Sequence, residues 1–299
     1  MKFNNLKISI IIIGYNTAKE LAALLNSINN LEDQKHLWEI IYIDDGSKDE
    51  SYHVFKTFNS PCVKLGKQLP ANSGRTFATQ EGINLASGVW YLFVRSNEIV
   101  STNLIVQFKQ TMKKTRAYAY MGAVHYSSKN KTFLNYLNNP RRGIKLYNVG
   151  EKIHYRFLLF NNSLILGSIF DQIKLNLDLT HYGGEELDFS YRLNKKHPKM
   201  ICASPNAIVF RHNYPPLKSH CLRLEEFGYT NFKKLAINLQ LDVVRYSFLL
   251  KKTAFLRIGV SVLYVVCNFF NSIVFNQNLY WLVRIQFLCA ILRGYYKLS

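Results

Sequence analysis

Polar and charged residues are concentrated in a few short segments of the 299-residue chain. The segments are Gly14-Tyr15-Asn16, Asp44-Asp45-Gly46-Ser47, Arg95-Ser96-Asn97-Glu98 and the adjacent carboxylates Glu185-Glu186. Binding a nucleotide requires an acceptor for the base edge, an aromatic face for the ring, and cations or amide donors for the phosphates. Asp45 can accept from an imide N–H, Tyr15 offers a ring face, and Arg75 offers a planar fork of donors that suits a phosphate.

The same residues also have structural explanations. Asp44 and Asp45 could cap the start of a helix, and Arg75 could form a surface ion pair. Glu185 and Glu186 could simply lie at a helix N-terminus, where carboxylates are stabilised by the helix dipole. We favour nucleotide binding for Asp45 and leave both explanations open for Arg75.

Apolar strand patterns alternate with helix patterns between these segments. Residues 8–13 form an isoleucine-rich run, typical of a strand covered on both faces. Further strands are predicted at residues 38–43, 62–65, 90–94 and 202–210, and helices at residues 49–58 and 73–86. Strands joined by such helices pair in parallel with right-handed crossovers, and ligands bind beyond their carboxyl ends. We therefore predict an α/β fold with a mostly parallel central sheet, at one edge of which the polar segments meet.

The charge of the chain restricts the class of partner. Lys and Arg number 38 against 19 Asp and Glu, a formal net charge of +19. This favours nucleic acid, an acidic membrane surface or a phosphate-bearing substrate, with a solvated basic surface as the alternative. The basic residues are dispersed without a nucleic-acid motif, so we predict that nucleic acid is not the partner. The five cysteines lack metal-site or redox spacing, which indicates a cytosolic compartment.

The composition changes after about Tyr214. We therefore predict a first domain at residues 1–214 and a basic, apolar helical region at residues 215–299. Residues 211–299 contain twelve Lys or Arg and three Asp or Glu.

Two apolar stretches of the C-terminal region are candidates for membrane contact. Residues 258–275 reach only the lower limit for a membrane span, and Asn268 and Asn271 weaken them as a lipid-facing helix. Residues 279–292 contain Arg284 and are shorter still. Because basic residues and amphipathic rings flank both stretches, we predict helices that lie in or dip into an anionic cytoplasmic leaflet. A hairpin packed on the first domain as ordinary core is the alternative.

Four pieces of the sequence together resemble a known family. They are residues 10–16, residues 43–49, Asn72-Ser73-Gly74-Arg75 followed by Gly82, Ala86 and Gly88, and the acidic segment at residues 183–193. In this order and at these strand-to-helix positions, they resemble the inverting family 2 glycosyltransferases, which have a GT-A-type fold. The resemblance covers roughly residues 7–213.

The resemblance implies transfer of a sugar, with inversion, from a nucleotide-sugar donor that is UDP-linked. It implies a nucleotide site made of Gly14, Tyr15, Asn16, Asp45, Arg75 and Asn97, with Asp45 on the base. In the family an Asp takes the proton of the acceptor hydroxyl; Glu186 occupies that position here, with Glu185 as a competitor. Asp188 falls in the acceptor region. Membrane contact suggests a lipid-linked glycan or a growing surface polysaccharide as acceptor, at the cytoplasmic face of the cell membrane.

The turn at residues 95–98 departs from the family pattern. The family holds a divalent cation with an Asp-x-Asp-Asp-like turn, whereas Arg95 and Asn97 leave only Glu98 as a hard oxygen ligand. His212 matches a place where relatives can carry a further ligand. Three interpretations stay open: Mn²⁺ or Mg²⁺ held by Glu98 and His212, direct charge compensation by Arg95, or an inactive membrane-bound scaffold of the same fold.

Overall fold

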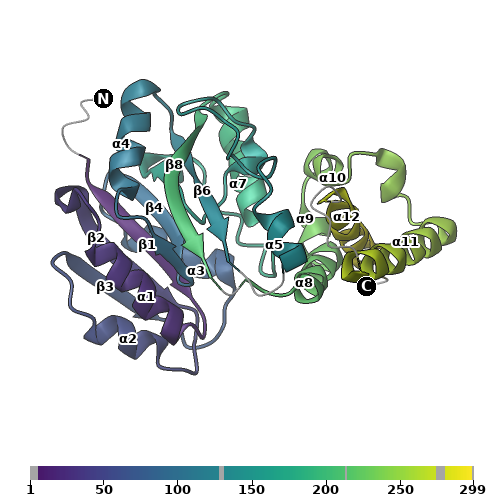
Figure 1. The fold of residues 1–299 in the computed structure, drawn as a ribbon, viewed down its shortest axis with the longest axis horizontal. Helices are drawn as coiled ribbons and strands as arrows, with labels where there is room; N and C mark the ends of the chain where they lie inside the picture. The colour runs from purple at the N-terminus through teal and green to yellow at the C-terminus, as the bar shows by residue number, and fades with distance from the viewer. Residues whose placement is uncertain (1–5, 128–130, 213, 274–279, 298–299) are drawn as a thin grey trace.

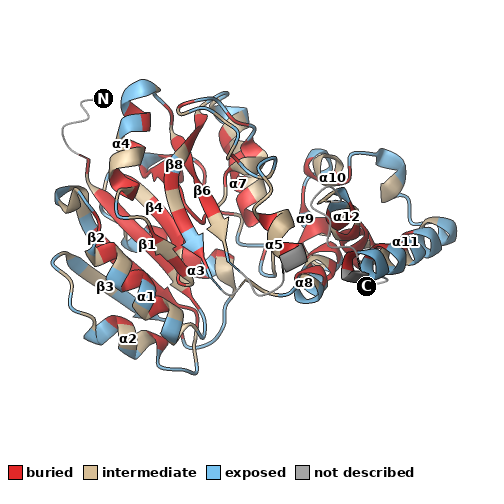
Figure 2. Ribbon diagram, in the orientation of Figure 1, coloured by how far each residue is buried: buried red, intermediate tan, exposed pale blue. Residues whose placement is uncertain are grey.

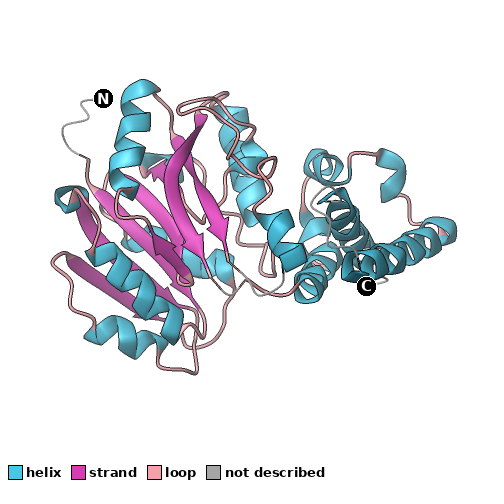
Figure 3. Cartoon of the chain, viewed as in Figure 1, coloured by secondary structure: helices cyan, strands magenta, loops and turns pink. Residues whose placement is uncertain are grey.

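The computed structural model describes residues 6–127, 131–212, 214–273 and 280–297. Its centre is a sheet with the strand order β3-β2-β1-β4-β7-β6-β8-β5 (Figure 1). The strands are β1 (Ile8–Gly14), β2 (Leu37–Asp44), β3 (Val63–Gln68), β4 (Trp90–Arg95), β5 (Glu98–Val100), β6 (Ala119–Tyr126), β7 (Ser163–Leu166) and β8 (Ile201–Arg211). Helices flank the sheet, as Figure 3 shows.

The strand directions correct the prediction of a mostly parallel sheet. Strands β3, β2, β1 and β4 are parallel, as predicted, but β7 runs antiparallel to both β4 and β6. Beyond it, β6 and β8 pair in parallel, and the short β5 is antiparallel to β8. The sheet is mixed because the chain between β4 and β8 is not a succession of strand–helix–strand crossovers, which alone would force parallel pairing.

The helices of the first domain are α1 (Ala18–Asn29), α2 (Ser51–Thr57), α3 (Arg75–Leu85), α4 (Leu104–Lys114), α5 (Lys131–Leu137), α6 (Ser168–Gln172) and α7 (Glu185–Lys196). Short 3₁₀ turns lie at η1 (Gln34–His36) and η2 (Tyr155–Phe157). Helix α1 presents an apolar stripe to the core, since Leu21, Leu24, Leu25 and Ile28 are all fully buried. Burying such a stripe against the sheet stabilises a helix more than its intrinsic propensity does.

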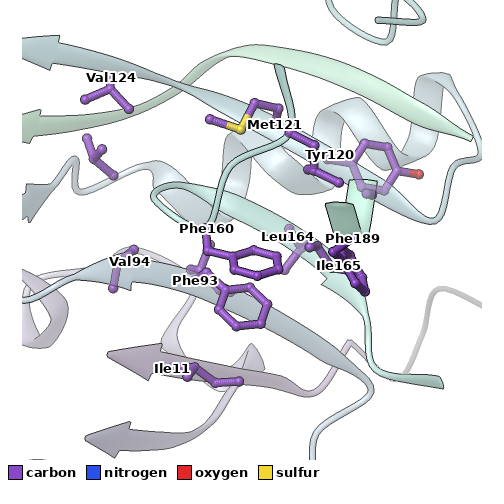
Figure 4. Packing of buried hydrophobic residues seen from close by; sticks show 14 of the residues in the cluster. Ile11, Phe93, Val94, Tyr120, Met121, Val124, Phe160, Leu164, Ile165 and Phe189 are labelled. Atoms are coloured by element: carbon purple, nitrogen blue, oxygen red, sulfur yellow. The ribbon is translucent and has the colours of Figure 1, made fainter. Parts of the chain in front are cut away.

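A cluster of phenylalanines ties the end of β4 to the acidic helix α7. Phe93 on β4 stacks on Phe160 with ring centroids 4.7 Å apart, and Phe160 in turn packs against Phe189 of α7 at 5.4 Å (Figure 4). Phe170 of α6 stacks on Phe189 at 4.9 Å. This packing fixes the start of α7 relative to the carboxyl edge of the sheet.

After β8 the described chain is helical. The helices are α8 (Leu217–Tyr229), α9 (Asn231–Lys234), α10 (Ile237–Val244), the 3₁₀ turn η3 (Ser247–Leu250), α11 (Ala254–Ile273) and α12 (Tyr280–Tyr296). Helices α8 and α12 cross so closely that a Cβ on Gly228 or Gly294 would overlap the backbone of the other helix. Helix α12 also meets α5, where Phe133 packs against Phe287. The helical unit is thus docked on the first domain through α8 and α12.

Helix α11 has a different environment from α12. It contains an 18-residue window, Ala254–Asn271, that is long and apolar enough to cross a membrane, and only 17% of that window is buried. Within the described residues it is the one helix that meets this criterion of length and composition. Figure 2 shows α11 exposed along most of its length, beside the more buried α12. Helix α12 is therefore packed as part of the protein core, whereas α11 contributes only one narrow side to that core.

Candidate active site

The polar turns after the strands meet at one rim, as predicted. In the sheet register, Gly14 is level with Asp44, and Ile13 is level with Arg95, so three neighbouring parallel strands end together. A cavity of about 470 Å³ opens at this edge. Its lining includes Gly14, Tyr15, Asp45, Arg75, Arg95 and Asn97. A cavity of this volume is typical of small-molecule sites.

Asp45 is buried at the inner wall of this cavity. Its Oδ1 accepts from the backbone N–H of Ser73 at 2.8 Å, and its own N–H donates to Gly14 at 2.8 Å. Burial raises the pKa of Asp45, although hydrogen bonds from the Ser73 and Gly74 amides oppose the shift. These bonds fix the orientation of the carboxylate in the wall of the cavity.

The preceding aspartate and Asn16 organise the loops around the cavity. Asp44 accepts from Gln68 Nε2 at 2.9 Å and from the backbone of Ser47. The backbone N–H of Asn16 donates to Ser47, and its side-chain oxygen accepts from the Lys48 amide. Asn16 thus acts through loop geometry and is not part of the cavity lining. The helix-cap explanation for the aspartate pair is wrong, because α2 begins only at Ser51 and neither aspartate caps it.

Two glycines set the start of α7 and thereby its carboxylates. Gly183 and Gly184 have φ values of 82° and 94°, a region that side-chain-bearing residues rarely adopt. The ring of Phe227 lies against both, where a Cβ would come within 3.0–3.2 Å of it. The sharp turn brings Glu185 and Glu186 to the site edge, opposite the rim formed by the strands.

The carboxylates of α7 are paired with arginines of the rim. Arg75, the first residue of α3, donates through Nε and Nη2 to Glu185 Oε1. Arg95 Nη2 lies 3.1 Å from Glu186 Oε1, which also accepts from the Phe160 amide at 2.9 Å. Arg75 Nη2 is 3.9 Å from Glu186 Oε2. Arg75 therefore forms a partly buried ion pair and lines the cavity as well.

Glu186 is held as a carboxylate. Burial by itself would raise its pKa, but the charges of Arg75 and Arg95 and the Phe160 amide outweigh burial and lower the pKa. Glu185 is almost completely enclosed and engaged by Arg75, whereas Glu186 lines a second cavity of about 280 Å³. Of the two carboxylates proposed as a base, the structure gives Glu186 the better access to a substrate.

The second cavity contains residues that sequence analysis did not select. It adjoins the first, and both are lined by Arg75, Arg95, Tyr182, Arg211 and Arg223. Arg142 and Arg156 line the second cavity but not the first. Arg211 stands beside the selected His212, and Arg142 lies in the conspicuous segment Asn139-Pro140-Arg141-Arg142-Gly143, so both were visible as basic residues without an assigned role.

Asp188 and His212 are not brought to either cavity lining. Asp188 Oδ2 accepts from Arg192 Nε at 2.9 Å, one turn further along α7. His212 is exposed, and its Nδ1 lies 2.6 Å from the hydroxyl of Ser127. An acceptor contact for Asp188 and a metal-ligand role for His212 remain predictions without support from this arrangement.

The donor set at the rim does not fit a divalent cation. Glu98 is fully buried, and its Oε2 accepts from the Arg95 amide at 2.8 Å. Burial raises the pKa of Glu98 to about 7, against the opposing charges of Arg211 and Arg95, so the group loses much of its anionic character near neutral pH. Among the described residues no three His, Cys, Asp or Glu side chains are grouped to hold a metal ion. Guanidinium groups occupy this side of the cavity instead.

Comparison with known proteins agrees with the geometry. The model of the family described as glycosyl transferase family 2 matches residues 9–174, and the chain belongs to this family. It is a glycosyltransferase with a GT-A-type α/β fold. The glycosyltransferase GlyG of Streptococcus pneumoniae is 29% identical over 213 residues, 68% of this chain and 70% of GlyG.

Other relatives match a smaller part. The poly(ribitol-phosphate) β-N-acetylglucosaminyltransferase TarS of Staphylococcus aureus is 27% identical over 114 residues, 38% of this chain but only 19% of TarS. The structure of TarS 1–349 with UDP-GlcNAc has a TM-score of 0.55 at 15% identity, covering 74% of this chain and 65% of that one. The mannosyltransferase PcManGT of Pyrobaculum calidifontis, with GDP-Man and Mn²⁺, has a TM-score of 0.58 at 12% identity, covering 76% and 63%. These structural likenesses support the fold.

Proposed function

We propose that this glycosyltransferase moves a sugar from a UDP-sugar, with inversion, to a hydroxyl of a lipid-linked or polysaccharide acceptor in cell-surface glycan synthesis. One observation carries the proposal: Asp45 and Arg95 line the same cavity, and Arg95 donates to Glu186 at 3.1 Å. A base-recognising carboxylate and a proton-accepting carboxylate are thus connected across one site. The relatives include enzymes named for transfer to poly(ribitol-phosphate) and structures with UDP and UDP-GlcNAc.

In the proposed reaction the acceptor oxygen attacks the anomeric carbon of the donor. Its proton passes to the carboxylate of Glu186, and the bond from the anomeric carbon to the diphosphate breaks, with the electron pair leaving on UDP. Attack from the face opposite the leaving group inverts the configuration. Asp45 accepts from the base, and Tyr15 offers an aromatic face beside it.

The arginines link donor binding to the strength of the base. In the unliganded site, Arg95 and Arg75 lower the pKa of Glu186 against the effect of burial. A diphosphate beside these guanidinium groups adds negative charge and competes for their hydrogen bonds. The pKa of Glu186 then rises, and the carboxylate becomes a stronger base once the donor is in place.

We further propose that charge on the leaving diphosphate is compensated by Arg95 and Arg211 rather than by a resident metal. Both line the donor cavity, and Glu98 is turned away to the Arg95 amide. Preorganised cations in a buried site stabilise developing negative charge without reorganisation. PcManGT, of the same fold, is described with Mn²⁺, so this departure would distinguish the present chain.

A donor screen tests the proposal. Purified protein is incubated with UDP-, GDP- and TDP-sugars, and binding is followed by calorimetry and nucleotide release by a coupled assay, with EDTA or with Mn²⁺. We expect selective binding of a UDP-sugar, retained in EDTA and lost in Asp45→Asn. Binding without turnover on any acceptor would favour the scaffold alternative, and absence of nucleotide-sugar binding would refute the proposal.

Membrane attachment through α11 is the second part of the proposal. Val260, Cys267 and Asn271 form the buried side of the helix. Asn271 donates to Gln286 of α12 at 2.6 Å, and Gln286 donates to Asn268 at 3.1 Å. The two asparagines that weakened the stretch as a lipid-facing helix are therefore satisfied by α12.

The opposite side of α11 is apolar and exposed. Its exposed residues are Phe255, Ile258, Val262, Leu263, Val265, Val266, Phe269 and Phe270. Lys251, Lys252 and Arg257 are exposed at the start of the helix. An apolar face beside basic residues is suited to an anionic leaflet, where each nearby basic residue contributes about 1 kcal/mol. We propose that α11 lies against the cytoplasmic face of the cell membrane and brings the site to a membrane-bound acceptor.

Vesicle flotation tests this attachment. The wild type should float with phosphatidylglycerol-containing vesicles, and the double variant Ile258→Glu/Val262→Glu should remain in the dense fraction. The matched control Val63→Glu/Leu146→Glu alters two exposed apolar residues of the first domain and should float. Failure of the wild type to float, or equal behaviour of both variants, would refute attachment through α11.

A further inference from the structure

We propose that the acceptor carries a phosphate group and that the second cavity binds this phosphate through Arg142, Arg156 and Arg223. The inference rests on the proposed glycosyl transfer and names the chemical class of its acceptor. A phosphodiester polymer and a lipid phosphate both present the same oxygens to a guanidinium group, and the test below distinguishes these two sources.

The second cavity has a strong excess of positive charge. Its lining contains Arg75, Arg95, Arg142, Arg156, Arg211 and Arg223, against the single carboxylate Glu186. Arg75 and Arg95 are paired with the carboxylates of α7. Arg156 Nη2 lies 3.8 Å from the Asp242 carboxylate and donates to its backbone carbonyl at 3.2 Å, while Arg142, Arg211 and Arg223 form no ion pair with any residue that the structure describes.

The charge of these arginines lowers the pKa of a neighbouring histidine. His220 lies in the cavity wall, and burial together with Arg142, Arg223 and Arg211 lowers the pKa of this residue to about 3. Arg211 is 8% exposed, and its Nε has no hydrogen-bond partner among the described atoms. Gathering unpaired cations away from water is costly, and an anionic ligand would offset that cost.

The arginines are positioned by aromatic rings, which leave their charge uncompensated. The Arg142 guanidinium lies 5.2 Å from the Tyr126 ring centroid and 5.3 Å from that of Tyr136. Arg211 lies 4.8 Å from the Tyr214 ring. Arg142 Nη1 also donates to the Leu137 carbonyl at 3.4 Å, and neither a ring face nor a carbonyl cancels the charge that a phosphate would meet.

The arginines that line only one of these two cavities indicate that the bound phosphate belongs to the acceptor and not to the donor. Arg75, Arg95, Arg211 and Arg223 border both cavities and can meet the donor diphosphate. Arg142 and Arg156 border the cavity that also contains Glu186 and a neighbouring cavity of about 220 Å³, but neither borders the donor cavity. A hydroxyl at Glu186 would therefore place a phosphate of the same molecule near these two arginines.

The test uses the full chain saturated with UDP, so that the donor diphosphate site is filled. Calorimetry measures binding of inorganic phosphate, of a short glycerol-phosphate oligomer, and of vesicles containing dodecyl phosphate. We expect at least one of the last two probes to bind, together with inorganic phosphate. Arg142→Gln and Arg156→Gln should each weaken this binding by about tenfold to a hundredfold, as expected for loss of hydrogen bonds to a charged group. UDP affinity should be unchanged.

Two controls separate this result from misfolding and from general charge. Arg142→Lys keeps the charge and should bind phosphate more tightly than Arg142→Gln. Arg116→Gln removes an equal charge at an exposed position outside both cavities and should bind as the wild type does. Preference for the oligomer identifies a phosphodiester source, and preference for the vesicles a lipid source.

Three outcomes would overturn the inference. One is absence of phosphate binding when UDP is bound, and another is equal binding in Arg142→Gln, Arg156→Gln and Arg116→Gln. The third is a parallel loss of UDP affinity in the Arg142 and Arg156 variants, which would assign both arginines to the donor. Failure of UDP itself to bind would instead refute the proposed glycosyl transfer, so the two failures are distinguishable.

Discussion

Replacing Glu186 with glutamine isolates the proton-accepting role. The amide keeps the side-chain length and an oxygen that can accept from Arg95 at 3.1 Å and from the Phe160 amide at 2.9 Å. It cannot take the acceptor proton. General-base catalysis contributes about 10²–10⁴-fold, so kcat should fall by this factor, which corresponds to about 2.7–5.4 kcal/mol of activation free energy.

The same change should affect binding of the donor in the opposite direction. Loss of the carboxylate charge releases Arg95 from its ion-pair partner and removes the weaker contact of Arg75 at 3.9 Å. UDP-sugar affinity should therefore stay constant or increase while kcat falls. Calorimetry for binding and a single-turnover assay for the chemical step measure the two effects separately.

The pH dependence gives an independent check of the coupling between donor and base. In the proposed mechanism the ionised form of Glu186 is the active one, and Arg75 and Arg95 lower its pKa in spite of burial. The acidic limb of kcat/KM, which reports the free enzyme, should therefore lie below the ordinary range of a glutamate. The acidic limb of kcat, which reports the enzyme with donor bound, should lie at higher pH.

Two matched variants complete the test. Glu186→Asp restores a carboxylate and should retain more activity than Glu186→Gln. Glu185→Gln removes the charge paired with Arg75 and should lower thermal stability more than it lowers kcat per folded molecule. Wild-type kcat in Glu186→Gln, together with loss of turnover in folded Glu185→Gln, would show that the base has been assigned to the wrong carboxylate.

Three further predictions concern the rim and its support. Burial raises the pKa of Glu98 in the folded state to about 7. Between about pH 4.5 and 7 the folded state therefore holds a proton on Glu98 that the unfolded state has lost. The free energy of unfolding should then decrease as pH rises through this range, by up to about 3 kcal/mol. Glu98→Gln should remove this contribution in urea titrations at several pH values, while Glu50→Gln, at an exposed position, should not. Arg95→Ala should reduce turnover more than ground-state UDP binding, and turnover of the wild type should be equal in EDTA and in Mn²⁺; a requirement for Mn²⁺ would contradict compensation by arginine. Gly14→Ala should destabilise by about 1–3 kcal/mol, because the new Cβ would lie 2.5 Å from the hydroxyl of the fully buried Tyr42, whereas Gly259→Ala, with no atom within 4 Å, should be neutral or stabilising in the same thermal melts.

The first half of the sheet could be predicted because its strands are defined by local patterns. The isoleucine run of β1 and the apolar run of β2 are each bounded by polar turns, and their observed limits lie within a residue or two of the predicted ones. The sheet beyond β4 could not be predicted in this way. Strand β7 has only four residues and pairs antiparallel with β4, a partner chosen by tertiary packing and not by local sequence.

In the candidate site, too, residues in recognisable local segments could be predicted, whereas contacts between residues far apart in sequence could not. Asp45 and Glu186 stand in recognisable segments, and their positions at the rim follow from the order of strands and helices. Arg75 was left open between phosphate binding and a surface ion pair, and its partner Glu185 lies 110 residues away in sequence. Arg211 follows a predicted strand but has a role only because β8 carries it beside Arg95, which no local pattern specifies.

The membrane stretch illustrates why composition alone was insufficient. Asn268 and Asn271 reduce the apolarity of the α11 sequence, and from sequence they count against lipid contact. In the structure both belong to the side facing Gln286 of α12. Polar residues concentrated on one side of a helix leave the other side more apolar than the average suggests, which only the packing partner reveals.

Arg95 stands where the resemblance to the family implies an aspartate, and this difference would change the electrostatics of the site. An aspartate at this position would add negative charge beside Glu186 and require a cation to bring the diphosphate in. Arg95 instead compensates Glu186 before the donor binds, at 3.1 Å, and lines the cavity where the diphosphate would lie. The guanidinium group of Arg95 can thus neutralise the Glu186 carboxylate first and the leaving diphosphate afterwards. Arg95 also adds to the excess of arginines in the adjoining second cavity, so a phosphate-bearing acceptor would be attracted to this side of the site more strongly than an uncharged sugar.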